Sequence, residues 1–395
     1  MTAAIIITIS VLLLVAYLFD ITSSKTRIPS VILLLALGWL IKEAAFLLKI
    51  TIPDLSFALP LLGTVGLILI VLDGSLDLEL DRSKTKIITK HFLGATFSIA
   101  ALTAIFAWLF MYYGASDLRV SILNAIPISI ISSAIAIPST KMMCKRNREF
   151  AVYDTSFSDV IGVVIFSYIM MNYSFTTKSM AYFGFQIVLM ILISITASAG
   201  LSYLLGRMRH QIKFVPIILL VILIYSIAEM YHLPALIFIL LFGLTIGNMD
   251  KIVELPWIKK FVYGSIEKEV IRFREITSEA TFLIRSLFFL VFGFLIETED
   301  ILDTHSLQLA LIIIGIIIAV RAIQLKLTGN KLLPLLFIVP RGLITILLFL
   351  SIAVEDQIGF INRNLILQII VLTTLVMILG TTSVKKEKRE IQNEN

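Results

Sequence analysis

Long apolar segments recur along almost the whole chain and limit what it can fold into. A helix that spans a bilayer needs about 20 mostly apolar residues. Hydropathy marks thirteen such segments in the 395 residues, and little chain is left between them. They cover residues 3–19, 28–48, 57–77, 91–113, 118–140, 150–172, 180–205, 214–231, 234–248, 277–297, 306–325, 332–352 and 362–382. We therefore predict an all-α polytopic membrane protein with about 13 transmembrane helices, in which the short 234–248 segment is a broken or tilted helix.

The overall composition agrees with this reading. Hydrophobic residues make up 58% of the chain, whereas soluble domains are about 45–50% apolar, so no separate soluble domain is expected. The first segment lacks a basic start and a small-residue cleavage site, which favours a retained helix over a signal peptide. Cys144 is the single cysteine, which excludes an internal disulfide and a cysteine metal cluster.

The basic residues orient the predicted spans. An odd number of spans places the two termini on opposite sides. With the C-terminus in the cytoplasm, 25 of the 33 Lys and Arg residues fall in inner loops and four in outer loops. Because inner loops carry the excess of Lys and Arg, we predict an outside N-terminus, a cytoplasmic C-terminus and a location in the cell (inner or plasma) membrane. The net charge of +6 then faces anionic lipid rather than nucleic acid.

The loops are short, with one exception. Residues 249–275 are predicted to form an amphipathic linker on the inner surface, as between two halves of a transporter. We expect one transmembrane domain over residues 1–383 and a short cytoplasmic tail at 384–395.

Charged residues inside spans are costly and are functional candidates. The bases are Lys42, Arg285, Arg321 and Arg341, and the acids are Asp73, Asp154, Asp159, Glu229 and Glu279.

Asp159, in the apolar stretch SFSDVIGVVIF (156–166), is the deepest of these acids. It lies about nine residues, or about 14 Å, from the inner end of its span, near the middle of a core of about 30 Å. Thr155 lies four residues before Asp159 and shares its helix face. Asp154 and Ser158 have the same spacing and share the adjacent face. The alternative role for Asp159 is that of a packing carboxylate neutralised by a neighbour.

Arg321 is expected at a depth similar to that of Asp154. An ion pair between them, reaching Ser158, would compensate both charges. The alternative is that Arg321 extends to the inner surface, as long basic side chains near span ends do.

Two spans carry helix-breaking residues near the midplane. In AIPISIISSAIAIPST (125–140), Pro127 and Pro138 flank Ser132 and Ser133, and LLPLLFIVPRGLITILL (332–348) contains Pro340-Arg341-Gly342. Proline removes a helix hydrogen bond, and the freed backbone groups must face protein or water. Each break alone could be a simple proline kink. Together they are typical of a secondary transporter with inverted repeats and two discontinuous crossing helices.

Six segments, in this order, resemble motifs of the monovalent cation:proton antiporter superfamily, which includes the bacterial sodium/proton exchangers. The resemblance covers most of the chain from the third span onward. The segments are VLDGSLDLELD (71–81), ISSAIAIPS (131–139), DTSFSDVIGVVIF (154–166), RSLFFLVFG (285–293), IIAVRAIQLKL (317–327) and FIVPRGLITILL (337–348).

The resemblance implies roles for individual residues. Asp159 matches the essential aspartate that binds cation and proton, and Arg321 matches the buried basic residue that pairs with this helix. Ser158 stands where the family usually has Asn or Asp. Thr155 and Asp154 stand where exchangers often have Ser and Glu.

The resemblance also covers the two breaks. Arg341 and Gly342 match the second crossing, and Asp73 lies in the acidic-glycine motif. Ser132 and Ser133 occupy the first crossing, where many sodium exchangers have Thr-Asp, and this pair looks more like the potassium-efflux branch. A homodimer with a moving core domain is implied in the same way.

The chemistry follows from one buried carboxylate. Burial raises the pKa of a carboxyl group, so such a group can hold either a proton or a cation near neutral pH. Oxygens of Thr155 and Ser158, with freed carbonyls of the first crossing, could complete a site for Na⁺, or for K⁺ or Li⁺, at Asp159. We predict cation/proton antiport by alternating access, without a cofactor. The exchange is predicted to be electroneutral, because position 158 supplies no second acid.

Three other classes of protein remain as alternatives. A sodium-coupled solute symporter can share crossing helices, but few substrate-binding groups are evident. A membrane enzyme is disfavoured because the four histidines lie at span ends or in loops, without metal spacing. A transporter-like sensor is disfavoured because the tail is short.

Overall fold

The computed structural model describes residues 2–26, 29–49, 55, 58–78, 85–114, 116–140, 143–173, 176–207, 214–249, 266–297 and 303–393. These residues form helices and no strands. The helices before the long inner loop are α1 (Thr2–Thr26), α2 (Ser30–Leu47), α3 (Ala58–Asp77), α4 (Thr85–Gly114), α5 (Leu118–Ser129), α6 (Ser133–Ser139), α7 (Lys145–Met171), α8 (Thr177–Arg207), α9 (Phe214–Met230) and α10 (Ala235–Gly247). Those after it are α12 (Ile266–Phe294), α14 (Thr304–Leu327), the 3-10 turn η2 (Leu335–Phe337), α15 (Leu343–Ser351), the 3-10 turn η3 (Val354–Asp356) and α16 (Arg363–Asn393).

Each of the thirteen predicted spans coincides with a helix or with a pair of helical pieces. Nine helical stretches of the described residues are long and apolar enough to cross a membrane. The predicted short span is the 13-residue helix α10, and α5 with α6 and η2 with α15 replace two continuous spans. The all-α polytopic fold is therefore confirmed. Residues 250–265 of the predicted inner linker lie outside the described residues, and α16 continues through the predicted tail to Asn393.

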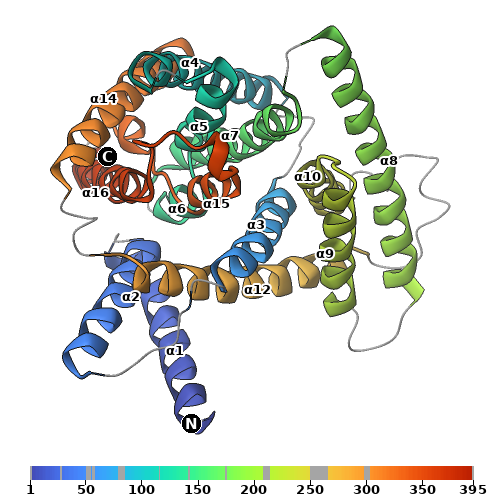
Figure 1. Cartoon of the computed structure of the whole chain (residues 1–395), viewed down its shortest axis with the longest axis horizontal. Coiled ribbons are helices and arrows are strands. Elements are labelled where there is room, and N and C mark those ends of the chain that lie inside the picture. The colour runs from blue at the N-terminus through green and yellow to red at the C-terminus, as the bar shows by residue number, and fades with distance from the viewer. Residues whose placement is uncertain are drawn as a thin grey trace. The chain divides into compact units, whose positions relative to one another are not determined.

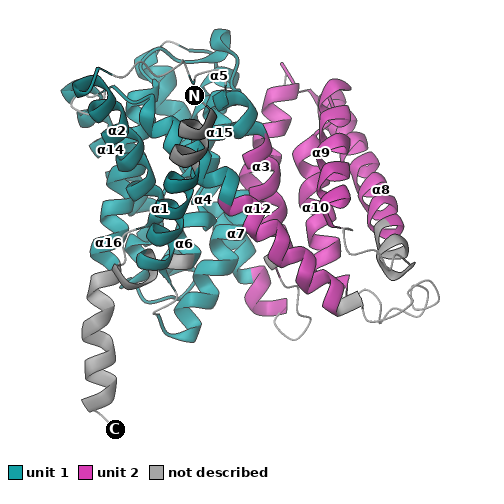
Figure 2. Ribbon diagram, turned by 90° about the horizontal axis from the view of Figure 1, so that it is seen from below, with its two compact units in different colours: residues 1–64, 90–159, 283–395 teal, residues 65–89, 160–282 magenta. Residues whose placement is uncertain are grey.

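The chain divides into two compact units (Figure 2). Unit 1 comprises residues 1–64, 90–159 and 283–395, and unit 2 comprises residues 65–89 and 160–282. Within unit 1, α4, α14 and α16 lie along the top and left of a group of helices, and the short pieces α5, α6 and α15 lie on its right and lower side, next to α7 (Figure 1). Unit 1 therefore contains both interrupted helices and most of the predicted site residues.

Glycines let helices approach closely in both units. In unit 2, Gly243 and Gly247 of α10 face α3, and a Cβ atom at Gly247 would lie 2.5 Å from the carbonyl oxygen of Leu76. In unit 1, Gly38 of α2 faces the backbone of α12 near Leu290, and Gly293 of α12 faces the backbone of α2 at Leu35. Small residues at such crossings are typical of membrane helices, which gain stability from close packing rather than from a hydrophobic driving force.

Helix α14 has a clear signal at each end. At its start, Asp303 accepts a hydrogen bond from the backbone N–H of His305 and a second from the hydroxyl of Ser306, which lowers the pKa of the Asp303 carboxyl. At its end, Gly329 has φ +57°, and the N–H groups of Gly329 and Asn330 donate to the carbonyls of Lys326 and Leu325. This is the glycine-capped helix end in which the last carbonyls find partners.

Candidate functional site

The two interrupted helices meet at their breaks. Helix α5 ends at Ser129 and α6 begins at Ser133, while the second break runs from the end of η2 to the start of α15 at Leu343. The backbone N–H of Ser132 donates to the carbonyl of Pro340 at 2.9 Å. A Cβ atom at Gly342 would lie 2.6 Å from Ser132 Oγ, so glycine permits this contact. The first break falls between the two prolines, since Pro127 lies inside α5.

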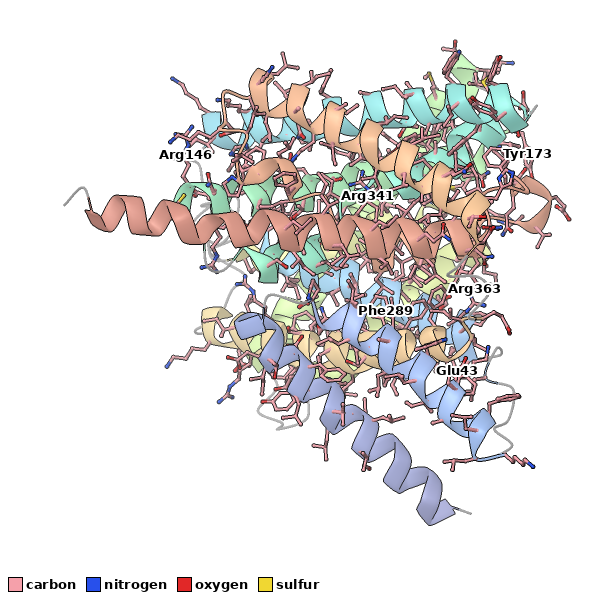
Figure 3. All side chains as sticks on the ribbon, turned by 90° about the vertical axis from the view of Figure 1, so that its left-hand side faces the viewer. Glu43, Arg146, Tyr173, Phe289, Arg341 and Arg363 are labelled. Carbon is pink, nitrogen blue, oxygen red and sulfur yellow. The ribbon has the colours of Figure 1, made fainter. Side chains whose placement is uncertain are left out.

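Arg341 fills the space between the breaks and is fully buried. Its Nε donates to the carbonyl of Ile128 at 2.7 Å, Nη1 to that of Val339 at 2.8 Å and Nη2 to that of Ser129 at 3.2 Å. Two of these carbonyls end α5, where the helix dipole is negative and stabilises a cation. Arg341 lies midway between the end of unit 1 marked by Arg146 and the end marked by Arg363 (Figure 3). Some carbonyls that the first break frees thus bind a guanidinium.

Asp154 belongs to a buried polar cluster. Its Oδ2 accepts from Arg321 Nη1 at 2.5 Å and its Oδ1 from Gln324 Nε2 at 2.6 Å. Arg321 also donates to Gln324 Oε1 at 2.7 Å and to the carbonyl of Leu335 at 3.2 Å. The side chains of Asp154 and Arg321 are each 1% exposed. Arg321 therefore does not extend to the surface, and the charge of Asp154 is compensated.

Asp159 lies farther along α7 and has a different environment. The hydroxyl and backbone N–H of Ser133 hydrogen-bond to its carboxyl group. Its Oδ1 atom is buried and, among the described residues, has no hydrogen-bond partner. The buried Ser132 Oγ also lacks one in that part of the chain. Asp159 Oδ1 and Ser132 Oγ are therefore two buried oxygens that are unpaired in the part of the chain that the structure describes.

Thr155 and Ser158 support the backbone near Asp159. The Thr155 hydroxyl donates to the carbonyl of Ala151 at 2.8 Å, within α7. Ser158 Oγ accepts from the backbone N–H of Ile131, in the first break, at 2.9 Å. The contact of Ser158 is therefore with the first break, rather than with the Asp154–Arg321 pair as the sequence suggested.

The structure brings nine of the ten predicted site residues together in unit 1. Asp73 lies on α3 in unit 2 and is not among them.

The family of the chain follows from a match over almost its whole length. The model of a family described as "Sodium/hydrogen exchanger, transmembrane" matches residues 9–386. The chain belongs to the sodium/hydrogen exchanger family. It is therefore a cation/proton antiporter and a multi-pass protein of the cell membrane, in a family of transporters rather than of enzymes.

Solved structures support the same fold. A structure of the sodium proton antiporter MjNhaP1 from Methanocaldococcus jannaschii at pH 8 matches with a TM-score of 0.66 and 17% identity, over 95% of this chain and 95% of that chain. An electron-microscopy structure of the same antiporter matches with a TM-score of 0.69 and 17% identity, over 99% and 97%. No curated protein sequence matches the chain.

Sequence reasoning missed Gln324, a member of this exchanger's buried polar cluster, and the buried His91, whose ring packs on residues beside that cluster. Gln324 follows Arg321 by three positions on α14, so the spacing that places residues on one helix face would have identified it. His91 is buried on α4, with its ring 4.9 Å from that of Phe150 and 6.0 Å from that of Tyr153. Phe150 in turn lies 5.1 Å from the Arg321 guanidinium carbon. His91 was missed because it stands close to a predicted span end.

Proposed function

We propose that this chain exchanges one Na⁺ for one H⁺ at Asp159, by alternating access and without net charge movement. K⁺ and Li⁺ are the alternative substrates. The observation that carries the proposal is the contrast between the two carboxylates of unit 1 on α7. Asp154 has both oxygens occupied, whereas Asp159 Oδ1 is buried, has no partner in the described part of the chain and lies beside a helix break.

The groups around Asp159 suit a small cation. Na⁺ prefers several oxygen ligands, and Asp159 Oδ1 and Ser132 Oγ are two with no partner among the described residues. The Thr155 hydroxyl donates a hydrogen bond to the carbonyl of Ala151, so its oxygen lone pairs remain able to bind a cation. Ser133 and Ser158 complete the proposed set of five residues. A proton on Asp159 neutralises the same charge that holds the cation, so the two substrates compete.

The proposed stoichiometry follows from the charges that remain uncompensated. Arg321 compensates Asp154, and Ser158 adds no charge. Arg341 and Gly342 hold the two breaks together and Arg341 adds a fixed positive charge, which we propose moderates the affinity for the cation. Asp73 is proposed as a structural residue. One exchangeable carboxylate then carries either one cation or one proton, and a homodimer would contain two such sites.

Asp159→Asn tests the proposal directly. In everted vesicles from an antiporter-deficient bacterium, acid-loaded by respiration, adding Na⁺, Li⁺ or K⁺ should release protons with the wild type. We expect Asp159→Asn to reduce this release to the background of empty vesicles, because the variant cannot hold either ligand by charge. Asp117→Asn is the matched control, since Asp117 is exposed and its side chain makes no cap hydrogen bond.

Two outcomes would contradict the proposal. Equal proton release by wild type and Asp159→Asn would make Asp159 a packing residue. Silence of a folded wild type with every cation would favour the sodium-coupled solute symporter. In proteoliposomes, a rate of exchange that changes with an imposed membrane potential would exclude electroneutral exchange.

The orientation and domain limits are part of the proposal. We propose an outside N-terminus, a transmembrane domain over residues 1–383 with an inner linker at about 249–275, and a cytoplasmic tail at 384–395. Cys144 is exposed and is the single cysteine, so its labelling in the unmodified wild type reports which side of the membrane it faces. A membrane-impermeant maleimide should label it in everted vesicles and not in intact cells. Labelling in intact cells alone would reverse the orientation.

A further inference from the structure

Basic side chains from three helices of unit 1 gather around one turn. The turn is Thr328–Asn330, which follows α14, and the side chains come from the first turns of α7, from α4 and from both sides of the turn itself. All six are exposed, and they lie at the end that the charge count places in the cytoplasm: Lys90, Lys145, Arg146, Arg148, Lys326 and Lys331.

Two of these cations reach the same residue. Arg146 Nη2 donates to the carbonyl of Gly329 at 3.5 Å. Lys90 Nζ lies 3.6 Å from the position that a Cβ atom on Gly329 would occupy. A helix C-terminus offers only about half a negative charge, so the turn attracts both cations without neutralising them.

These cations outnumber the acids that the structure describes near them. The ion pairs within the described residues of unit 1 include none of the six. The nearby Asp154 is bonded to Arg321 and Gln324, and Glu149 is the one other acid in the first turns of α7. The excess of positive charge is therefore available to an anion.

An apolar surface continues from this group along α4 and α14. Leu93 is 60% exposed, Ile323 is 50% exposed and Leu327 is 68% exposed. The two helices touch here, since a Cβ atom at Gly94 would lie 2.9 Å from Thr328 Cγ2. A ligand that fits both the basic group and the apolar surface has an anionic end and an apolar end. Basic pockets between transmembrane helices on the cytoplasmic side bind lipid headgroups.

We propose that the α4–α14 seam binds an anionic phospholipid of the inner leaflet. The phosphate lies against Lys90, Arg146 and Lys331, and the acyl chains lie along Leu93 and Leu327. The apolar part of the surface favours a lipid over an acidic protein or a nucleic acid.

Bound lipid would stabilise the buried cluster. Thr328 Oγ1 donates to the carbonyl of Gln324 at 2.8 Å, and Gln324 donates to Asp154. Arg146 lies in the first turn of α7, and Asp154 lies about two turns later on the same helix. A phosphate that joins Arg146 to Lys90 and Lys331 therefore ties together the helix ends that support the Asp154–Arg321 pair.

The test measures lipid binding by the purified full chain in detergent. Phosphatidylglycerol, cardiolipin and phosphatidylcholine are titrated, bound lipid is counted by native mass spectrometry and the apparent Tm is followed. Lys90→Gln/Arg146→Gln/Lys331→Gln should weaken binding of the anionic lipids about tenfold or more, since each charge contributes to attraction at the membrane surface. Lys86→Gln/Lys268→Gln/Arg272→Gln is the control, because it removes three exposed charges of unit 2.

Several results would overturn the proposal. The first is an equal loss of anionic-lipid binding in both triple variants, and the second is binding of phosphatidylcholine as tight as that of the anionic lipids. The third is a Tm shift with soluble glycerol phosphate equal to that with anionic lipid, which would indicate a simple anion site. If the first triple variant does not fold, Lys90→Gln alone should weaken lipid binding severalfold, and unchanged binding would count against the site. None of these measurements depends on transport, so they stand apart from the proposed exchange at Asp159.

Discussion

Asp154 and Asp159 stand five residues apart on one buried helix, yet their surroundings differ completely. Asp154 has one oxygen on Arg321 and the other on Gln324. Asp159 is bonded by Ser133, and its Oδ1 has no partner within the described residues. The difference teaches that charge at mid-membrane has two uses. A compensated carboxylate holds helices together, whereas an uncompensated one is the group that we propose exchanges ligands.

The largest effect on stability is expected at the compensated carboxylate. Asp154→Asn or Arg321→Gln leaves one charge buried without its partner, which costs about 3–5 kcal/mol. The double variant removes both charges and should recover much of that loss. Thermal and denaturant unfolding in detergent measure this cycle.

An exposed ion pair serves as the control for that cycle. Lys42 and Glu297 lie 3.2 Å apart with side chains 28% and 69% exposed, so their substitution should cost about 0–1 kcal/mol. If both single variants at Asp154 and Arg321 were as stable as wild type, the pair would not be structural. If Asp159→Asn were equally destabilising, the contrast between the two carboxylates would fail.

A smaller effect is expected at the second partner of Asp154. Gln324→Leu keeps the volume but removes the bonds to Asp154 Oδ1 and Arg321, and an unsatisfied buried polar group costs about 1–3 kcal/mol. The apparent Tm should fall while cation selectivity is unchanged. Gln308→Leu, at an exposed position on the same helix, should change neither. An unaltered Tm for Gln324→Leu would mean that Arg321 alone compensates Asp154.

The smallest effect on stability is expected at the first break. Ser132→Ala removes an oxygen without a partner in the described chain, so stability should change by less than about 0.5 kcal/mol. Ser158→Ala leaves the N–H of Ile131 unpaired and should cost about 1 kcal/mol. If Ser132 is a cation ligand, the apparent Na⁺ affinity of Ser132→Ala falls severalfold. Unchanged affinity would remove Ser132 from the proposed site.

Much of the fold could be predicted because, in a membrane, helix formation depends on each apolar segment alone. With no water to bond the backbone, each apolar segment must form its own helix. The thirteen segments therefore appear as helices, and the two breaks appear where Ser132 and Pro340-Arg341-Gly342 interrupt them. The position of the first break is less local, since it lies between the prolines and is held by Ser158 and Pro340.

The sequence by itself determined the spans, their breaks and the candidate acids, because apolar length, proline and charge affect the conformation and burial of the residues next to them in the chain. The similar depth of Arg321 and Asp154 also predicted their ion pair, which the structure contains. Only the tertiary structure decided the other partners, Gln324 for Asp154 and the α5 carbonyls for Arg341. Arg321 lies 167 residues from Asp154, and Arg341 lies 213 residues from the carbonyl of Ile128. Hydrophobic periodicity carries no information about such partners. Hydrogen-bond geometry does, and it exists only once the helices have packed.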